Sequence, residues 1–187
     1  MSPAEQLQVD NITGSVRNWV DSFVVDMNLC PFAKRELTNK RVRFAVTAAS
    51  NEVQLLTALQ TELELLNNDS SVETTLLIHP NLLQEFYHYN QFLDQADNLL
   101  LQMNLEGVYQ VASFHPHYQF DGSNVDDAQN YTNRSPYPLL HLLREASIER
   151  AIARVTDIEQ VPVRNTALMD KMGQSRLHQL WLACFTR

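Results

Sequence analysis

Three short runs with strand character recur along the chain at intervals of about thirty residues, and a helical pattern separates each from the next. Residues 41–47 alternate apolar and polar side chains, and residues 73–78 and 108–114 are rich in β-branched and apolar ones. Apolar residues at helical spacing fill residues 55–66 and 82–103 between them. This order is typical of right-handed crossovers in a parallel sheet. The sequence therefore predicts an α/β fold, with a βαβαβ core whose small, mostly parallel sheet is flanked by helices.

Further helices are predicted outside this core. Residues 12–27 carry an amphipathic stripe that ends at Cys30-Pro31, because proline lacks an amide hydrogen and pushes the preceding residue out of the helical region. Residues 139–155 carry a second stripe, with Pro138 suited to its first turn. We also expect a terminal helix at residues 177–185 and a short edge strand at residues 161–163.

The length and composition of the chain fit one globular domain, residues 1–187. Apolar residues make up 44% and charged residues 19%, and only four Gly and seven Pro argue against a low-complexity chain. A chain of 187 residues is long enough to carry its own hydrophobic core. We see no internal repeat and no linker, so a single domain is expected.

The charge balance narrows the classes of partner. Fourteen Lys and Arg against 22 Asp and Glu give a net charge of −8, which repels nucleic acids and anionic lipid surfaces. No apolar run approaches the roughly 20 residues of a membrane span, and the first residues lack a secretory signal. Two distant cysteines, Cys30 and Cys184, fit free thiols in a reducing compartment. We expect a cytoplasmic protein with no nucleic-acid or membrane partner.

Two of the predicted strands end in the same dipeptide, His79-Pro80 and His115-Pro116. Ligands of open parallel sheets bind outside the carboxyl ends of the strands, so neighbouring strands would place two imidazoles at one edge. An imidazole accepts or donates a proton near neutral pH, which makes His115 and His79 candidate catalytic residues. The structural alternative is that each His-Pro pair only ends its strand, while the ring hydrogen-bonds to nearby backbone.

A long irregular segment, residues 112–138, begins in the third strand. Loops longer than about 12 to 15 residues are usually functional or disordered, and this one is too aromatic to be merely disordered. We expect it to close over the crevice at the strand ends, where Arg134 could bind a carboxylate or phosphate. Alternatively, Arg134 clamps Asp126 or Asp127 and pins the loop. The other candidate substrate-binding residues are Tyr118, Asp121, Asn130, Tyr131 and Asn133.

A metal site is a further alternative for the same histidines. His115, His117 and His79, with Asp121 as a possible fourth ligand, would satisfy zinc or iron in kind and number. The spacing is not diagnostic, because the chain has no His-Glu-x-x-His and no paired Cys-x-x-Cys motif. His141, which we expect on the following helix, could face the same crevice or be a partly buried helix residue. No particular cofactor is implied.

Cys30 heads the stretch Cys-Pro-Phe-Ala, which is similar to the glutaredoxin active-site motif with its second cysteine replaced by alanine. That motif follows a strand and opens a helix whose dipole lowers the thiol pKa, whereas here an amphipathic helix precedes it. Cys30 is therefore either a catalytic thiol or a structural one among core residues. The chain has no P-loop, Gly-x-Gly-x-x-Gly or Gly-x-Ser-x-Gly motif, which disfavours the corresponding enzyme classes.

Four stretches carry a resemblance to a known family: NLCPFA at 28–33, LLIHP at 76–80, ASFHP at 112–116 and NYTNRSPYPLLHLLREAS at 130–147. They resemble a family of bacterial proteins of similar length that is catalogued as a domain of unknown function. The resemblance spans nearly the whole chain and implies a single-domain bacterial protein. It brings no agreed activity, catalytic residue or cofactor to these positions.

Three hypotheses follow for the function. The first is a small enzyme with His115 and His79 as acid-base groups and Arg134 holding a small anionic substrate. The second is a non-catalytic module that binds a small ligand or a partner. The third is a metal-dependent enzyme that uses His79, His115 and His117. Whether the protein is an enzyme stays open at this point.

Overall fold

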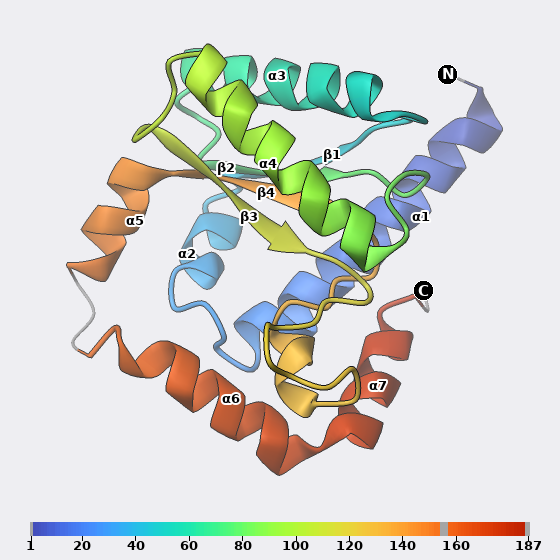
Figure 1. Ribbon diagram of the computed structural model, residues 1–187, viewed down its shortest axis with the longest axis vertical. Coiled ribbons are helices and arrows are strands. Elements are labelled where there is room, and N and C mark those ends of the chain that lie inside the picture. The colour runs from blue at the N-terminus through green and yellow to red at the C-terminus, as the bar shows by residue number, and fades with distance from the viewer. Residues whose placement is uncertain (1, 154–156, 186–187) are drawn as a thin grey trace.

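Four strands form one sheet in the order β1-β2-β4-β3 in the computed structural model, which describes residues 2–153 and 157–185 (Figure 1). Strand β1 pairs in parallel with β2, and β4 lies antiparallel to both β2 and β3. The chain is therefore an α/β protein with βαβαβ elements, but its sheet is mostly antiparallel. The strands are β1 (Val42–Val46), β2 (Thr74–Ile78), β3 (Tyr109–Phe114) and β4 (Leu139–Arg144).

The prediction of a mostly parallel sheet was wrong because β4 was taken for a helix. The sequence Leu-Leu-His-Leu-Leu-Arg, residues 139–144, has apolar side chains at positions that fit either pattern. Its first leucines, Leu139 and Leu140, and also Leu142 are completely buried, because this strand lies at the centre of the sheet with both faces covered. A strand buried on both faces loses the alternation that would identify it.

Helices α3 (Glu52–Asn68) and α4 (Phe86–Gln102) cover one face of the sheet. Asn51 caps α3 by accepting the backbone N–H of Gln54 at 3.0 Å. Four leucines of the predicted stripe on α3 are completely buried, and Leu56 is partly buried. Helix α4 begins at Phe86, four residues later than the stripe beginning at Leu82 indicated. Gly107, with a φ of 72°, makes the turn that leads into β3.

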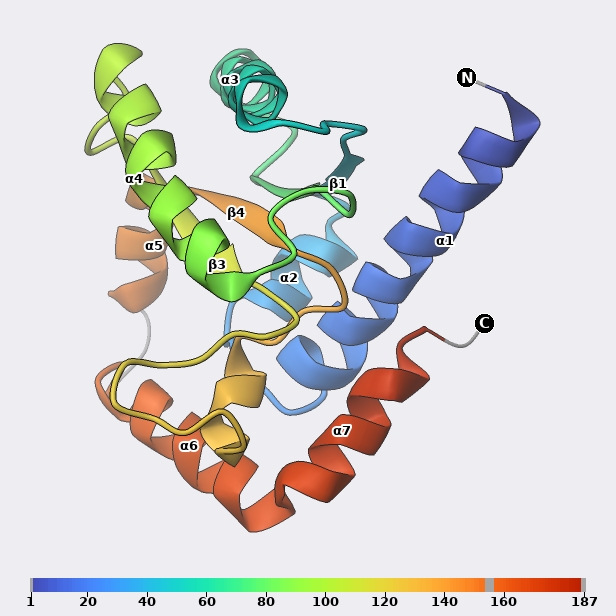
Figure 2. The ribbon, with the colours of Figure 1, turned by 45° about the vertical axis from the view of Figure 1, so that its right-hand side comes forward.

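The other face is covered by the N-terminal helices and by α5 (Figure 2). Helix α1 (Pro3–Trp19) runs on as a π-helix, η1 (Val20–Val25), and a turn at Cys30 leads to the short α2 (Ala33–Thr38). Helix α5 (Glu145–Ile152) follows β4 directly, so Pro138 precedes a strand rather than opening a helix. Val155, where the predicted helix was expected to end, lies outside the described residues.

The described C-terminal part consists of two helices joined at Gly173. Helices α6 (Gln160–Met172) and α7 (Gln174–Ala183) pack against the 3₁₀-helix η2 (Ala128–Thr132) in the long segment. The edge strand expected at residues 161–163 was wrong, because these residues belong to the first turn of α6. The terminal helix is confirmed, although it starts three residues earlier than expected, at Gln174.

Candidate functional site

The two strand-end histidines meet around one tyrosine, although β4 separates the strands that carry them. Tyr89 of α4 lies between the imidazoles, with ring centroids 5.8 Å from His79 and 5.0 Å from His115. His79, His115 and Tyr89 are all completely buried. The fold therefore brings His79 and His115 to one place, on the face of the sheet that α4 covers.

Hydrogen bonds fix the state of both imidazoles. His115 Nδ1 accepts the backbone N–H of His117 at 3.0 Å, so Nε2 carries the proton and donates to the carbonyl of Leu83 at 3.0 Å. His79 Nδ1 donates to the carbonyl of Leu82 at 3.1 Å, and its Nε2 is buried without a partner among the described residues. Burial lowers the pKa of each imidazole to about 4, so both are neutral near pH 7.

These contacts are of the kind that the structural alternative expects, since each ring bonds to backbone groups that lie near it in the fold. Neither imidazole has an edge open to water. Because general acid-base catalysis needs contact with substrate or with water, a catalytic role would require the Leu82 and Leu83 turn to open. The roles of His79 and His115 stay predictions.

Arg134 acts as a clamp inside the long segment. Its Nε donates to the carbonyl of Tyr118 at 3.1 Å and its Nη2 to that of Val125 at 2.6 Å. The guanidinium also lies over the ring of Tyr131, with Cζ 4.9 Å from the centroid. The clamp therefore holds backbone carbonyls rather than the expected carboxylates of Asp126 or Asp127. With 8% of its surface exposed, Arg134 offers little to a ligand.

Asn130 organises the same segment from its centre. Its Oδ1 accepts the backbone N–H of Phe120 at 3.1 Å and the hydroxyl of Ser123 at 3.0 Å. Its Nδ2 donates to the carbonyl of Asn124 at 2.8 Å, and the side chain is completely buried. All these partners belong to the loop itself, so this asparagine holds the loop in one conformation.

The remaining candidates of the segment divide between the fold and the surface. Asn133 Nδ2 donates to the carbonyl of Ser113 at 3.2 Å, and the hydroxyl of Tyr131 pairs with Nδ1 of His178 at 3.1 Å. Tyr118 and Asp121 line a shallow surface hollow of about 500 Å³ beside the start of α4. The structure thus joins Tyr118 and Asp121 but does not bring them together with the two strand-end imidazoles in one open crevice.

The metal alternative finds no geometric support in the described part of the chain. Residues 2–153 and 157–185 contain no group of three or more histidine, cysteine, aspartate or glutamate side chains placed to hold a metal ion. Both ring nitrogens of His115 are already hydrogen-bonded within the protein. The ring centroids of His117 and His115 are 5.8 Å apart, but His117 is exposed whereas His115 is buried.

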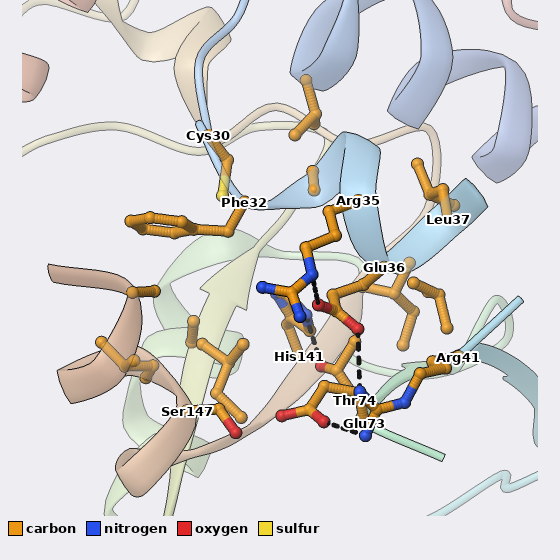
Figure 3. Close-up of a pocket in the computed structure, with 18 of the residues that line it drawn as sticks. Cys30, Phe32, Arg35, Glu36, Leu37, Arg41, Glu73, Thr74, His141 and Ser147 are labelled. Atoms are coloured by element: carbon orange, nitrogen blue, oxygen red, sulfur yellow. Dashed lines mark hydrogen bonds and ion pairs between the residues drawn. The ribbon is translucent and has the colours of Figure 1, made fainter. Parts of the chain in front are cut away.

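A larger cavity, of about 610 Å³, lies on the opposite face of the sheet (Figure 3). All four strands form its floor, and η1, the turn at Cys30, α2 and α5 form its walls. We call it the sheet cavity. Its apolar lining includes Val20, Val24, Phe32, Val42, Leu76, Ala112, Phe114, Leu143, Ile148 and Ala151.

His141 lies at the centre of the cavity floor. In the sheet register it stands between Leu76 of β2 and Ala112 of β3. Its position on a strand corrects the expectation that His141 lies on the following helix, and His141 does not face the crevice of His115, which was one of the two alternatives left open. Because side chains alternate along a strand, His141 and Leu143 face the sheet cavity while Leu140 and Leu142 face α3 and α4.

Thr74 fixes the protonation of this imidazole. The Thr74 hydroxyl donates its single proton to the carbonyl of Leu142 at 2.6 Å, so it must accept from Nε2 of His141, 2.8 Å away. The Nδ1 atom of His141 then carries a lone pair. Burial lowers the pKa of His141 to about 4, which keeps the ring neutral near pH 7.

Charged side chains gather at one end of the cavity. Arg41 is held by two carboxylates, Glu36 at 3.4 Å and Glu73, and these three groups form an ion-pair chain (Figure 3). Arg35 contributes only Nε to a 3.6 Å contact with Glu36, and its side chain is 62% exposed. Its terminal nitrogens have no hydrogen-bond partner among the described residues. Arg35 is therefore a cation whose terminal nitrogens are available to a ligand.

Among the described residues, four arginines and two glutamates line the sheet cavity, a formal sum of +2 in a chain of net charge −8. The other two arginines are Arg144 and Arg150. The guanidinium of Arg144 turns away to the hydroxyl of Tyr109 and the carbonyls of Leu66 and Val72. The exposed Arg150 donates to the hydroxyl of Ser147 at 2.7 Å. The local field therefore favours an anion.

Cys30 lines the same cavity as a half-buried free thiol, beside Phe32 (Figure 3). The other thiol, Cys184, is also free, but it is buried directly after the last residue of α7. Burial raises the pKa of the Cys184 thiol. The sequence drew attention to Cys30 but gave no reason to associate it with His141. Residues 139–144 lack the alternation that would mark them as a strand, so no local signal indicated that His141 faces away from α3 and α4.

Comparisons with known proteins add one match. A family model described as a protein of unknown function (DUF1415) matches residues 11–179, a range that includes the whole sheet, the imidazole pair and the sheet cavity. No curated protein and no solved structure matches the chain. No helix among the described residues has the length and apolar character needed to cross a membrane. The match confirms the resemblance seen in the sequence and assigns no activity to either site.

Proposed function

The chain belongs to the DUF1415 family of proteins of unknown function, and on that premise we propose that it binds a small molecule with an apolar body and an acidic group in the sheet cavity. The observation that carries this proposal is the cavity itself, about 610 Å³ of space over the sheet. Small-molecule sites have volumes of about 300 to 1,000 Å³ and mostly apolar walls with few polar groups. The sheet cavity has both properties.

The apolar lining specifies the body of the ligand. Leucine, valine, alanine and phenylalanine side chains from the four strands, η1 and α5 face the space, and they gain free energy when they leave water. An alkyl chain or a small ring system fits such a surface. A wholly polar ligand would lose its hydration here without compensation.

Arg35 specifies the acidic group. Glu36 and Glu73 both pair with Arg41, and Arg35 reaches Glu36 through Nε at 3.6 Å, while the terminal nitrogens of Arg35 have no hydrogen-bond partner among the described residues. Figure 3 shows Arg35 reaching from α2 toward the sheet, between Phe32 and Glu36. A guanidinium so placed presents its fork of donors to a carboxylate or phosphate.

A binding measurement with decanoate and decanol tests the proposal, because the two probes share an alkyl chain and differ in the acidic group. Titration calorimetry should show decanoate binding, and Arg35→Ala should weaken it about tenfold while decanol binding stays unchanged. Lys34→Ala is the matched control, since Lys34 is the exposed neighbour on α2 and does not line the cavity.

A cavity-filling variant separates this site from others. Ala151→Trp on α5 places an indole in the cavity wall and should abolish decanoate binding in a protein that circular dichroism shows to be folded. Decanoate binding that survives Ala151→Trp, or equal effects of Arg35→Ala and Lys34→Ala, would overturn the proposal.

The enzyme hypothesis, with His115 and His79 as acid-base groups and Arg134 binding a small anionic substrate, stays a prediction. What supports it is the approach of both imidazoles to Tyr89. His115→Ala and Arg134→Ala test it in a folded protein, since they should abolish turnover in a screen of small esters and phosphate esters. Decanoate binding in the sheet cavity should survive His115→Ala, because the two sites lie on opposite faces of the sheet.

A further inference from the structure

We propose that the ligand of the sheet cavity is a hydroxylated apolar acid, whose hydroxyl group donates a hydrogen bond to Nδ1 of His141. This inference rests on the proposed function and adds the second polar group of the ligand. The hydrogen bonds of the cavity floor carry this inference, because they leave Nδ1 of His141 as a hydrogen-bond acceptor that faces the sheet cavity.

The polarity of His141 follows from a chain of two hydrogen bonds. The carbonyl of Leu142 can only accept, so the hydroxyl proton of Thr74 is committed to it at 2.6 Å. The hydroxyl oxygen then receives Nε2–H of His141 at 2.8 Å, and a neutral ring carries no second proton. Nδ1 is therefore an acceptor and cannot donate.

Nothing in the described protein uses this acceptor. Nδ1 of His141 has no hydrogen-bond partner among the described residues. This atom is not fully buried, unlike Nε2 of His79, and the His141 side chain lines the sheet cavity. Nδ1 therefore borders the cavity. Its neighbours across the sheet, Leu76 and Ala112, have no side-chain donors. A donor for Nδ1 must come from water or from a ligand.

A ligand donor is favoured over water in a cavity with mostly apolar walls. A water molecule there has few other partners, whereas a ligand hydroxyl arrives with an alkyl body that the walls hold. Sites that hydrogen-bond a substrate hydroxyl discriminate strongly against the analogue that lacks it. Arg35 therefore binds the acidic group of the ligand, and His141 favours acids that also carry a hydroxyl group.

The choice between a hydroxyl and other donors follows from charge. An ammonium group would be repelled by the described lining, because even without Arg144, whose guanidinium turns away, three arginines stand against two glutamates. A hydroxyl donates one hydrogen bond without carrying charge, which matches one neutral acceptor. We therefore exclude amines from the class.

Three kinds of matched acid test the inference by calorimetry: decanoate, its hydroxylated derivatives at carbon 2, 3 or 10, and the methoxy analogue of the hydroxydecanoate that binds most tightly. At least one hydroxydecanoate should bind about tenfold more tightly than decanoate. Its methoxy analogue should lose that gain, because it keeps the oxygen and loses the donor. His141→Phe should remove the gain, so that this variant binds the hydroxydecanoate and decanoate with equal affinity.

A measurement on the unsubstituted protein keeps the test independent of variant folding. The ¹⁵N resonance of His141 Nδ1 should move when the hydroxydecanoate binds and stay in place with the methoxy analogue. Hydroxydecanoates that bind no better than decanoate, or a gain that persists in His141→Phe, would overturn this inference alone. Absence of decanoate binding to the cavity would instead overturn the proposed function.

Discussion

The imidazole of His79 stacks on the phenol ring of Tyr89, with the centroids 5.8 Å apart and the planes inclined by 14°. His115 contacts the same ring at 5.0 Å and 41°. Neither side chain reaches water, and burial is the main reason that the pKa of each is lowered to about 4. This aromatic group therefore requires neutral histidines, which ties the stability of the fold to pH.

The first prediction is a loss of stability in mild acid. The unfolded chain binds a proton at each histidine below a pKa of about 6.5, whereas the folded chain binds it only near 4. Unfolding therefore takes up protons between these values, and the free energy of unfolding falls as pH falls from 6.5 to 4. Each buried histidine contributes up to about 3 kcal/mol to this loss.

Urea unfolding at pH 7.5, 6, 5 and 4.5 measures this dependence. His79→Phe should flatten it, because one of the buried titrating groups is removed. His88→Asn is the matched control, since His88 is exposed on α4 and should leave the dependence unchanged. A wild-type protein whose unfolding free energy is constant from pH 6.5 to 4.5 would contradict the prediction.

The second prediction concerns the hydroxyl of Tyr89. It donates to the carbonyl of Leu139 at 2.8 Å and accepts the backbone N–H of Phe114 at 3.0 Å, so it joins β4 to β3 where both strands meet the long segment. Tyr89→Phe leaves two buried backbone groups without partners and should lower the unfolding free energy by about 1–3 kcal/mol.

Chemical denaturation of Tyr89→Phe beside Tyr87→Phe checks this value. Tyr87 lies on the same helix but is 70% exposed, and its variant should change stability by less than about 0.5 kcal/mol. Equal losses of unfolding free energy in the two variants would show that the hydrogen bonds of the Tyr89 hydroxyl to β3 and β4 do not stabilise the fold.

The third prediction concerns the clamp at Arg134. Because one guanidinium holds the carbonyls of Tyr118 and Val125 together, Arg134→Lys cannot keep both hydrogen bonds. We expect cleavage by a nonspecific protease within residues 119–127 to become at least about fivefold faster in Arg134→Lys, since a lost charged hydrogen bond costs about 1.5–3 kcal/mol.

Asp126→Asn is the control for this variant. Asp126 is exposed and was one of the expected partners of Arg134, whereas the guanidinium bonds to carbonyls instead. Cleavage of Asp126→Asn at the wild-type rate would agree with the carbonyl clamp. Faster cleavage of both variants would indicate that the carboxylate holds the loop after all.

The elements with a clear period could be predicted from the sequence. Helices α3 and α4 and strand β1 follow patterns of 3.6 or 2 residues, whereas β2, which is buried at all five positions, and β3 could be predicted from their β-branched and apolar residues. Strand β4 could not be predicted in this way, since the sheet buries both of its faces and Leu139, Leu140 and Leu142 show no alternation. One misassigned strand then changed the sheet from mostly parallel to mostly antiparallel.

The histidine pair and the sheet cavity also differ in how much of each could be predicted from the sequence. The imidazoles of His79 and His115 could be placed at strand ends, because a following proline marks each end. Their surroundings could not, since Leu82 and Leu83 lie in a turn whose carbonyls meet the rings only in the fold. The sheet cavity draws its walls from segments between residues 19 and 151, and no local pattern unites them.

The fourth prediction uses the two thiols as reporters of cavity occupancy. Cys30 is half-buried and lines the sheet cavity, whereas Cys184 is buried and its Sγ donates to the carbonyl of Leu180 at 3.4 Å. Burial raises the pKa of Cys184, so its reactive thiolate is scarce. Iodoacetamide at pH 8 should therefore alkylate Cys30 first, and peptide mass spectrometry should show this order.

Saturating decanoate should slow alkylation of Cys30 about tenfold, because a ligand in the cavity covers the thiol, and Arg35→Ala should remove this protection. Cys184 provides the internal control. Its rate depends on opening of the fold around α7 and should not change with decanoate if protection is local. Equal slowing at both cysteines would indicate stabilisation of the whole protein by a ligand bound elsewhere, and unprotected Cys30 would place the ligand outside the cavity.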